Sequence, residues 1–372
     1  MCEPRFYVIC NAGQLTRFAT FTEALAASKE TPVSGSGVLW LDFHRPTSED
    51  FAPLMEPLGL HPLAIEDCLD NNQVPKIEDF PYNTFIIFNA FNYEGSRLTV
   101  DEVDLFIGEN FVITTCGHAT AQEGVQAPPP LADAQRGPLT GIERIVERDI
   151  QSACQGPSFL LHIILDHIVD HKFAAIETLE DEMDRAEETI LSDLSNFNAA
   201  DLLRLRRDLL ALRKSLFHER EILVKICRKD CRFIAEQALF HYRDIYDHLA
   251  KFFELTENYR DIVASLTEMY LSMLNNQMSK SANDMNATIR RLTIITTIFM
   301  PLTLLAGIGG MSEWSMMTGA ENWRITYPAF LLAMAIIGVV NYILLKWLER
   351  RGQRLQSPRR LQKQEEAQVI HE

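Results

Sequence analysis

The sequence predicts an α/β domain at the N-terminus, a long helical stalk after it and two C-terminal transmembrane helices. All 17 glycines lie either within residues 1–156 or from Gly307 onward, and no proline lies between Pro157 and Pro301, so the segment between them has no strong helix breaker. Short β-branched and aromatic runs fill the first part of the chain. Two uncharged apolar stretches, 292–309 and 325–345, follow the helical region.

The N-terminal domain is predicted from strand-like runs separated by turn residues. We expect strands at Phe6–Ile9, Val38–Phe43, Thr84–Phe91, Val103–Ile107 and Phe111–Thr115. A stretch with three successive prolines, residues 126–137, is predicted to be a surface loop. Together these features predict a mixed α/β domain over 1–156.

The helical region contains two predicted breaks. The segment 191–198 collects Ser, Asp and Asn, which favour helix caps, so one helix should end there and another begin. A second break is expected between Cys227 and Gln237. The helix after it should run from Ala238 to Met300, about 95 Å at 1.5 Å per residue. We therefore predict a helical hairpin and a long stalk helix over 157–290.

The two apolar stretches are close to the roughly 20 residues that a bilayer-spanning helix needs, although buried core helices are the alternative. Basic residues precede the first stretch and follow the second, which predicts that both chain ends are cytoplasmic. We assign a first, pore-lining transmembrane helix to 291–309, an outer loop to 310–324, a second transmembrane helix to 325–348 and a basic cytoplasmic tail to 349–372.

Composition excludes several classes of function. The net charge of −16 argues against nucleic acid as a partner, and no glycine is followed by lysine, so a standard ATP-binding loop is absent. No nucleophile with base partners, closed metal-site spacing or glycine-rich cofactor loop indicates an enzyme. Seven scattered cysteines fit reduced thiols, and Cys227 with Cys231, one helical turn apart, either share a metal or simply pack.

One face of the first transmembrane helix is more polar than lipid contact favours. At steps of three and four it places Asn286, Ile289, Thr293, Thr296, Met300, Thr303, Gly307 and Gly310. Hydroxyl and carbonyl oxygens are the ligands that hard divalent cations accept. The alternative is that the threonines only bond back to their own helix. Two helices per chain cannot enclose a water-filled path, so conduction requires several copies.

Two further groups of polar residues have competing interpretations. His167 and His171, with Asp166 and Asp170, repeat at one helical turn and either bind a transition metal or serve helix packing. The acidic residues of the hairpin are predicted to form mainly a solvated face: Glu177, Glu180, Asp181, Glu182, Asp184, Glu187 and Glu188.

The segment 293–312, TIITTIFMPLTLLAGIGGMS, resembles the first membrane helix and signature of the CorA magnesium transporters. Residues 60–91, 159–191 and 240–279 resemble the N-terminal domain, acidic hairpin and stalk helix of that family, so nearly the whole chain is covered. The resemblance implies a funnel-shaped homopentamer with a central pore lined by the first membrane helix.

The resemblance also implies site residues. Gly310 and Met311 match the Gly-Met-Asn signature, but Ser312 stands where the family has asparagine, which puts selectivity for magnesium in question. Glu313 and Glu321 are the acidic residues of the outer loop. By rough position the family's regulatory metal ligands fall on Glu78, Asp79, Glu254, Glu257 and Asp261, and its inner basic cluster falls on Lys346, Arg350 and Arg351.

These observations predict a channel for hydrated magnesium, with cobalt or nickel as further ions, that is gated by cytoplasmic metal. The alternative is a zinc transporter resembling the ZntB branch, coupled to protons; a membrane-anchored enzyme and a protein that only scaffolds or senses are further alternatives. The expected location is a bacterial inner membrane, and the expected partners are further copies of the chain and membrane lipid. No cofactor is expected beyond the divalent cations that are transported or sensed.

Overall fold

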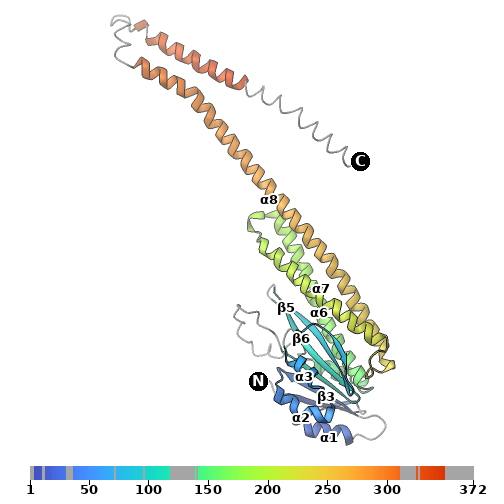
Figure 1. Ribbon diagram of the computed structural model, residues 1–372. Helices are drawn as coiled ribbons and strands as arrows, with labels where there is room; N and C mark the ends of the chain where they lie inside the picture. The colour runs from blue at the N-terminus through green and yellow to red at the C-terminus, as the bar shows by residue number, and fades with distance from the viewer. Residues whose placement is uncertain are drawn as a thin grey trace, which may run out of the picture. The chain divides into compact units, whose positions relative to one another are not determined.

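The computed structural model describes residues 4–10, 13–30, 37–70, 73–94, 97–117, 139, 141–310, 324–325 and 327–347 (Figure 1). The chain divides into two compact units, Met1–Leu271 and Ser272–Glu372. The first unit contains the sheet and most of the helices, and the second contains both apolar stretches. Each unit is described separately below.

The first unit is built on one seven-stranded sheet with the order β2-β1-β3-β7-β6-β5-β4. Neighbouring strands are antiparallel except β3 and β7, which are parallel, with Trp40 opposite Val112. The strands are β1 (Arg5–Cys10), β2 (Gln14–Phe18), β3 (Val38–His44), β4 (Ile77–Asp79), β5 (Asn83–Glu94), β6 (Arg97–Gly108) and β7 (Phe111–Cys116). All five predicted strands are confirmed. The short edge strands β2 and β4 were missed, because each is too short and too polar for a clear alternating pattern.

Helices cover both faces of this sheet. On one face, α1 (Phe21–Glu30), α2 (Ser48–Leu58) and α3 (Pro62–Leu69) pack on alternate strand residues, with Phe51, Leu54 and Ile65 in the same core cluster as Leu41 and Phe106. Toward the other face lie α4 (Ile142–Arg148), α5 (Ile150–Ala153) and the long helix α6 (Pro157–Ser192). The result is a three-layer arrangement with the sheet in the middle.

Local chemistry explains where several helices begin and end. Gly59 ends α2 at a φ of 62°, and a Cβ at this position would lie 2.8 Å from the Cβ of Tyr82, so both conformation and space favour glycine. Pro157 opens α6 at its first turn. Asn198 accepts a hydrogen bond of 3.1 Å from the backbone N–H of Ala200 and so caps α7 (Ala199–Cys227). The predicted break at 191–198 is confirmed.

The second predicted break is also confirmed. α7 ends at Cys227, a short 3₁₀ turn (Glu236–Ala238) follows, and α8 runs over Leu239–Gly309. One expectation was wrong here. Cys231 lies in the loop after α7, so the two thiols are not on successive turns of one helix. α8 continues past Pro301 to Gly309, in agreement with the transmembrane helix predicted over 291–309, because a proline inside a membrane-type helix is tolerated when neighbouring groups satisfy the freed carbonyl.

A fully buried ion pair joins the sheet to α6 and α7. The Lys172 ammonium of α6 donates to Glu219 of α7, and both side chains are 0% exposed. Glu219 also accepts a 3.0 Å hydrogen bond from the backbone N–H of Asn89 in β5. The same ammonium lies 4.6 Å from the ring centroid of Phe88. Burial lowers the pKa of Lys172, and the carboxylate of Glu219 opposes that shift.

The second unit holds two helices that are long and apolar enough to cross a membrane: the C-terminal part of α8 and Tyr327–Trp347. None of the residues in their most apolar windows is buried, whereas the core helix of a soluble protein would be mostly buried. A Cβ on Gly338 would lie 3.7 Å from Leu302 Cδ1, an ordinary van der Waals distance, so the two helices are close to each other at this position. The boundary at residue 290 between stalk and membrane helix remains a prediction.

The buried pair generates a stability prediction. Lys172→Met leaves the Glu219 carboxylate buried without its counter-charge, so the free energy of unfolding should fall by roughly 3–5 kcal/mol. Chemical unfolding of the purified protein measures this. Lys172→Met combined with Glu219→Leu should lose less than the single variant, and Lys251→Met, at an exposed position of α8, should change little. A single variant as stable as the control would contradict the role assigned to the pair.

Candidate ion pathway and regulatory carboxylates

The polar stripe predicted from the sequence lies on the exposed surface of α8 in the second unit. Asn286, Thr293, Thr296, Thr303 and Gly307 are all exposed in the single chain. A surface of this kind, rich in hydroxyl oxygen inside an apolar stretch, is unfavourable against lipid and favourable against water or another polar face.

The threonines of this stripe bond back to their own helix, as one interpretation of the sequence expected. The hydroxyl of Thr293 donates to the carbonyl of Ile289 at 2.9 Å, and that of Thr296 donates to Leu292 at 2.8 Å. Thr303 makes the same bond to Phe299 at 2.8 Å. Each bond uses the single hydroxyl proton and leaves oxygen lone pairs on the exposed side. The stripe therefore presents hydrogen-bond acceptors, and the two interpretations of the threonines are compatible.

Two apolar side chains interrupt these acceptors. Ile289, between Asn286 and Thr293, is 50% exposed, and Met300, between Thr296 and Thr303, is 73% exposed, so both project outward within the row. In the second unit a shallow open groove of about 850 Å³ adjoins the same part of α8 and is lined by Met300, Pro301, Thr303, Leu304, Gly307 and Ile308. Along the exposed face, residues with side-chain oxygens thus alternate with apolar residues.

Several predicted site residues lie outside the described part of the chain. These are Met311, Ser312, Glu313, Glu321, Arg350 and Arg351. Of the neighbouring predicted residues, Gly310 follows the end of α8, and Lys346 is exposed with its ammonium 5.6 Å from the ring of Tyr342.

The predicted regulatory carboxylates of the N-terminal domain lie on the edge strand β4, where each has a cationic partner. Glu78 is 3.0 Å from the ammonium of Lys76, and Asp79 is 2.7 Å from the ammonium of Lys225 on α7. Asp79 also accepts a 2.6 Å hydrogen bond from the Thr84 hydroxyl. Of these contacts, the pair between Asp79 and Lys225 joins the edge strand to α7.

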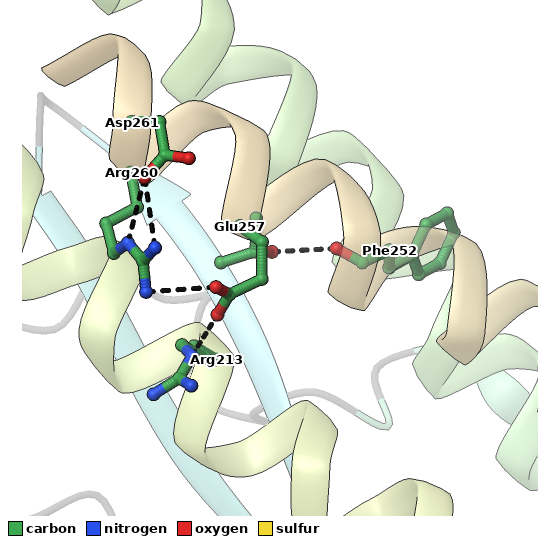
Figure 2. Close-up of polar contacts among 6 residues, drawn as sticks. Arg213, Phe252, Glu257, Arg260 and Asp261 are labelled. Atoms are coloured by element: carbon green, nitrogen blue, oxygen red, sulfur yellow. Dashed lines mark hydrogen bonds and ion pairs between the residues drawn. The ribbon is translucent and has the colours of Figure 1, made fainter. Parts of the chain in front are cut away.

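The predicted carboxylates of α8 include two that are held by arginines (Figure 2). Glu257 accepts from Arg213 of α7 and lies 2.9 Å from Arg260, one turn along α8. Asp261 lies 3.0 Å from the same Arg260 guanidinium. Glu254 is exposed. Within the described residues, no three His, Cys, Asp or Glu side chains come together as a metal site in one chain.

The cations that hold these carboxylates were not predicted from the sequence. Arg260 follows Glu257 by three residues, a helical spacing at which side chains meet, so this pair was readable from the sequence. Arg213 and Lys225 belong to another helix, and no local pattern connects them to Glu257 or Asp79.

The histidine pair of α6 is a packing feature. His167 is buried, and its ring lies 4.2 Å from that of His171, which bonds to the His167 carbonyl at 2.8 Å. Burial and the neighbouring His171 lower the pKa of His167 to about 4. A neutral ring is therefore present at pH 7.

The acidic hairpin is only partly a solvated face. Asp181 and Asp184 are exposed, but Glu180 accepts a 2.6 Å hydrogen bond from the Tyr259 hydroxyl of α8. Glu182 is buried and accepts from Tyr93 of β5 at 3.0 Å and from Arg204 of α7 at 2.7 Å. Two of the acidic residues thus connect α6 to its neighbours.

Comparison with known proteins identifies what this arrangement resembles. Residues 35–347 match the family described as "CorA-like Mg2+ transporter protein". A putative metal ion transporter of Bacillus subtilis, YfjQ, is 32% identical over 82% of this chain and 88% of its own length. The cobalt/magnesium transport protein CorA of Thermotoga maritima is 32% identical over 79% of this chain and 78% of its own. The solved structure of the CorA magnesium transporter from Methanocaldococcus jannaschii superposes with a TM-score of 0.62 at 19% identity, covering 94% of this chain and 98% of that one.

The lowered pKa of His167 predicts a loss of stability in acid. The unfolded chain takes up this proton near pH 6.5 and the folded chain only near pH 4, so the free energy of unfolding falls as the pH drops between these values. Melting temperatures at pH 7.5 and 4.5 should differ less in His167→Gln than in the unchanged protein. His248→Gln, at an exposed position paired with Asp244, serves as control. Equal acid sensitivity in all three proteins would refute the assignment.

Proposed function

The chain belongs to the CorA-like Mg²⁺ transporter family, and from that premise we propose that it is a channel through which hydrated magnesium crosses a membrane, with cobalt and nickel as further ions. It is a membrane-spanning divalent metal ion transporter and not an enzyme. The observation that carries the proposal is the exposed row of threonine oxygens on α8.

The threonine oxygens suit an ion that keeps its water. Magnesium gives up its water shell reluctantly, and the bound water molecules point their hydrogens outward. The water molecules of such a shell donate hydrogen bonds, so a surface of acceptors suits them best. The hydroxyls of Thr293, Thr296 and Thr303 donate their protons to carbonyls of their own helix, so each offers the pathway an acceptor and no donor. Carboxylates, which would help to strip water from a divalent cation, are absent from the row, since Asn286 to Gly310 contains no Asp or Glu.

A pathway of this kind requires several chains. The polar row covers one face of one helix, and two membrane helices cannot surround water. We propose a homopentamer in which the rows of five α8 helices line a central pore. Ile289 and Met300 would then form apolar rings between the oxygen rings, and narrow apolar rings stop ion flow when they lose water.

The proposed location is a bacterial inner membrane with both termini in the cytoplasm. Basic residues before 292 and after 345 support this orientation. Bringing two positive charges inward across about 100 mV gains roughly 4.6 kcal/mol, so uptake needs no chemical fuel. Lipid contacts the outer surface of the apolar helices, and Lys346 with Arg350 and Arg351 supplies a basic inner cluster.

Regulation and selectivity are the finer parts of the proposal. Glu78, Asp79, Glu254, Glu257 and Asp261 bind cytoplasmic metal between neighbouring subunits and favour the closed pore. Gly310, Met311 and Ser312, with Glu313 and Glu321, form the outer mouth. Serine offers one hydroxyl where an asparagine would offer an amide, so the outer ring is wider and its dipoles weaker.

Reconstitution tests the transported ion. Purified protein in liposomes should take up magnesium at a rate that does not depend on an imposed pH gradient, because the driving force is the ion's own gradient and the voltage. Liposomes without protein are the control. Uptake of zinc that follows the proton gradient, with no magnesium uptake, would instead establish the zinc transporter, and no flux of either ion would establish a scaffold or sensor.

Substitution of one oxygen tests the pathway. Thr296→Val keeps the shape of the side chain and removes an acceptor from each subunit, so magnesium flux should fall several-fold while the melting temperature stays within a few degrees. Thr267→Val is the matched control. The hydroxyl of Thr267 makes the same back-bond, to the carbonyl of Val263 at 2.8 Å, but this exposed residue of α8 lies outside the apolar stretch. Equal flux in the two variants would place the pathway on another face.

A further inference from the structure

One carboxylate oxygen is buried without a hydrogen-bond donor where the helices α6 and α7 meet the sheet. It is Oδ2 of Asp208 on α7, to which no group in the described part of the chain donates. α6, α7 and β5 come together at this junction (Figure 1). An acceptor that is closed off from water and has no donor destabilises the fold, because it has lost the water that bonds to it in the unfolded chain.

The donors at this junction are directed at a second carboxylate, Glu182 of α6, which is 8% exposed. Its Oε2 atom accepts from the Tyr93 hydroxyl of β5 at 3.0 Å and from Nη2 of Arg204 at 2.7 Å. Arg204 lies one helical turn before Asp208 on α7. Burial and the bond to Glu182 raise the pKa of Tyr93, so its hydroxyl keeps the proton that it donates. Of the two carboxylates, Glu182 thus has both donors and Oδ2 of Asp208 has neither.

The charges that face Asp208 do not offset its burial. Burial raises the pKa of Asp208 to about 6; three arginines oppose this shift and one carboxylate adds to it. Asp208 therefore exchanges a proton at mildly acidic pH, where an ordinary aspartate stays ionised. The charged groups that face it are Arg204 and Arg207 of α7, Glu182 of α6 and Arg97 of β6, and the neutral Tyr93 of β5 is close to the same group.

A proton on Asp208 would supply the donor that the junction lacks. A protonated carboxyl group has one O–H that donates, whereas an ionised one only accepts. Two carboxylates that face each other also retain a proton more strongly than either does alone, because both cannot be charged without repulsion. Protonation of Asp208 thus removes its repulsion by Glu182 of the neighbouring helix and gives it a hydrogen to donate.

We propose that Asp208 and Glu182 form a proton-binding site, which makes α6 and α7 pack more firmly on the sheet as the pH falls. Arg204 and Tyr93 hold Glu182 in place within it. The site is separate from the polar row of α8 and from the carboxylates of β4 and α8, so it does not depend on which ion the protein carries. Its response to pH is opposite in sign to that of His167, which makes the fold less stable in acid.

The sign of the response follows from where the proton binds. The folded chain takes up this proton near pH 6, and the unfolded chain takes it up near the ordinary value of 3.8. Between these values the folded state holds more protons, so the contribution of Asp208 to the free energy of unfolding rises as the pH falls. The gain is complete below pH 3.8 and is lost as the pH rises through 6.

Asp208→Asn tests the site, because the amide has the shape of the acid, carries no charge and donates as the protonated group does. It should raise the melting temperature of the purified protein by several degrees at pH 7.5, where Asp208 is charged. The rise should be much smaller at pH 4.5, where Asp208 of the unchanged protein is also neutral. Glu221→Gln, an equal charge change at an exposed position of the same helix, should have the same effect at both pH values.

Infrared difference spectra give a direct readout of the proton. Between pH 7.5 and 5.0 the unchanged protein should gain the band of a protonated carboxyl group that titrates near pH 6, and Asp208→Asn should lack this band. A group that only holds the helices together would not produce it. Asp208→Ala removes the same carboxyl group and takes the place of Asp208→Asn if that variant has no cooperative melting transition.

Two outcomes would overturn the inference. One is a change of melting temperature in the Asp208 variant that is equal at both pH values, as in Glu221→Gln. The other is a carboxyl band that titrates near pH 6 and persists in the variant. Both readouts use purified protein without ion flux, so they decide the inference whether or not the proposed channel conducts.

Discussion

The arrangement of the first unit depends on one buried interaction, the ion pair between Lys172 and Glu219. It brings together α6, α7 and β5 at a point from which water is excluded. Desolvating two charges is costly, so replacement of the whole pair by apolar residues can leave stability unchanged. The pair matters because its hydrogen bonds are directional. The Lys172 ammonium and the Asn89 N–H both donate to the same oxygen of Glu219, and they can do so only in one relative register of α6, α7 and β5. We infer that the pair selects this register among other apolar packings.

The proposed ion pathway, by contrast, requires more than one chain. Every residue of the polar row is exposed, and four of the proposed regulatory carboxylates, Glu78, Asp79, Glu257 and Asp261, are paired with cations of the same chain. These two features are complementary. The exposed polar row carries hydrogen-bond acceptors without formal charge, while those four carboxylates are already paired. Assembly of the proposed oligomer would therefore bring together faces that do not repel one another, whereas a row of bare carboxylates would repel.

Much of the fold was predictable from the sequence, because long helices and buried strands have a strong periodic signal. The central strands, both helix breaks and the two apolar helices followed from breakers, caps and the length of uncharged runs. The edge strands β2 and β4 did not, since their short polar sequences resemble loops.

Contacts of the candidate site within one helix were predictable from the sequence, whereas contacts between two elements were not. The polar row on α8 follows from spacing alone, as does the contact of Glu257 with Arg260. Other pairs join elements that are remote in sequence, and no local sequence pattern predicts them. These pairs are Asp79 with Lys225, Glu257 with Arg213 and Glu180 with Tyr259. For His167 and His171 a local pattern suggested a site that the structure does not support. Their spacing of one helical turn suggested metal ligands, but His167 is buried and its ring packs against that of His171.

The order of the two units along the chain has a consequence for biosynthesis. The first unit is complete at Leu271, and both apolar helices follow it. Domains fold as units as they emerge during translation, so the sheet and its helices are finished before either membrane segment leaves the ribosome. The newly made protein therefore reaches the bilayer with a folded, highly acidic body that cannot be threaded across. Only the two short apolar helices and the segment between them remain to be inserted, and the body itself keeps the nascent chain in one orientation.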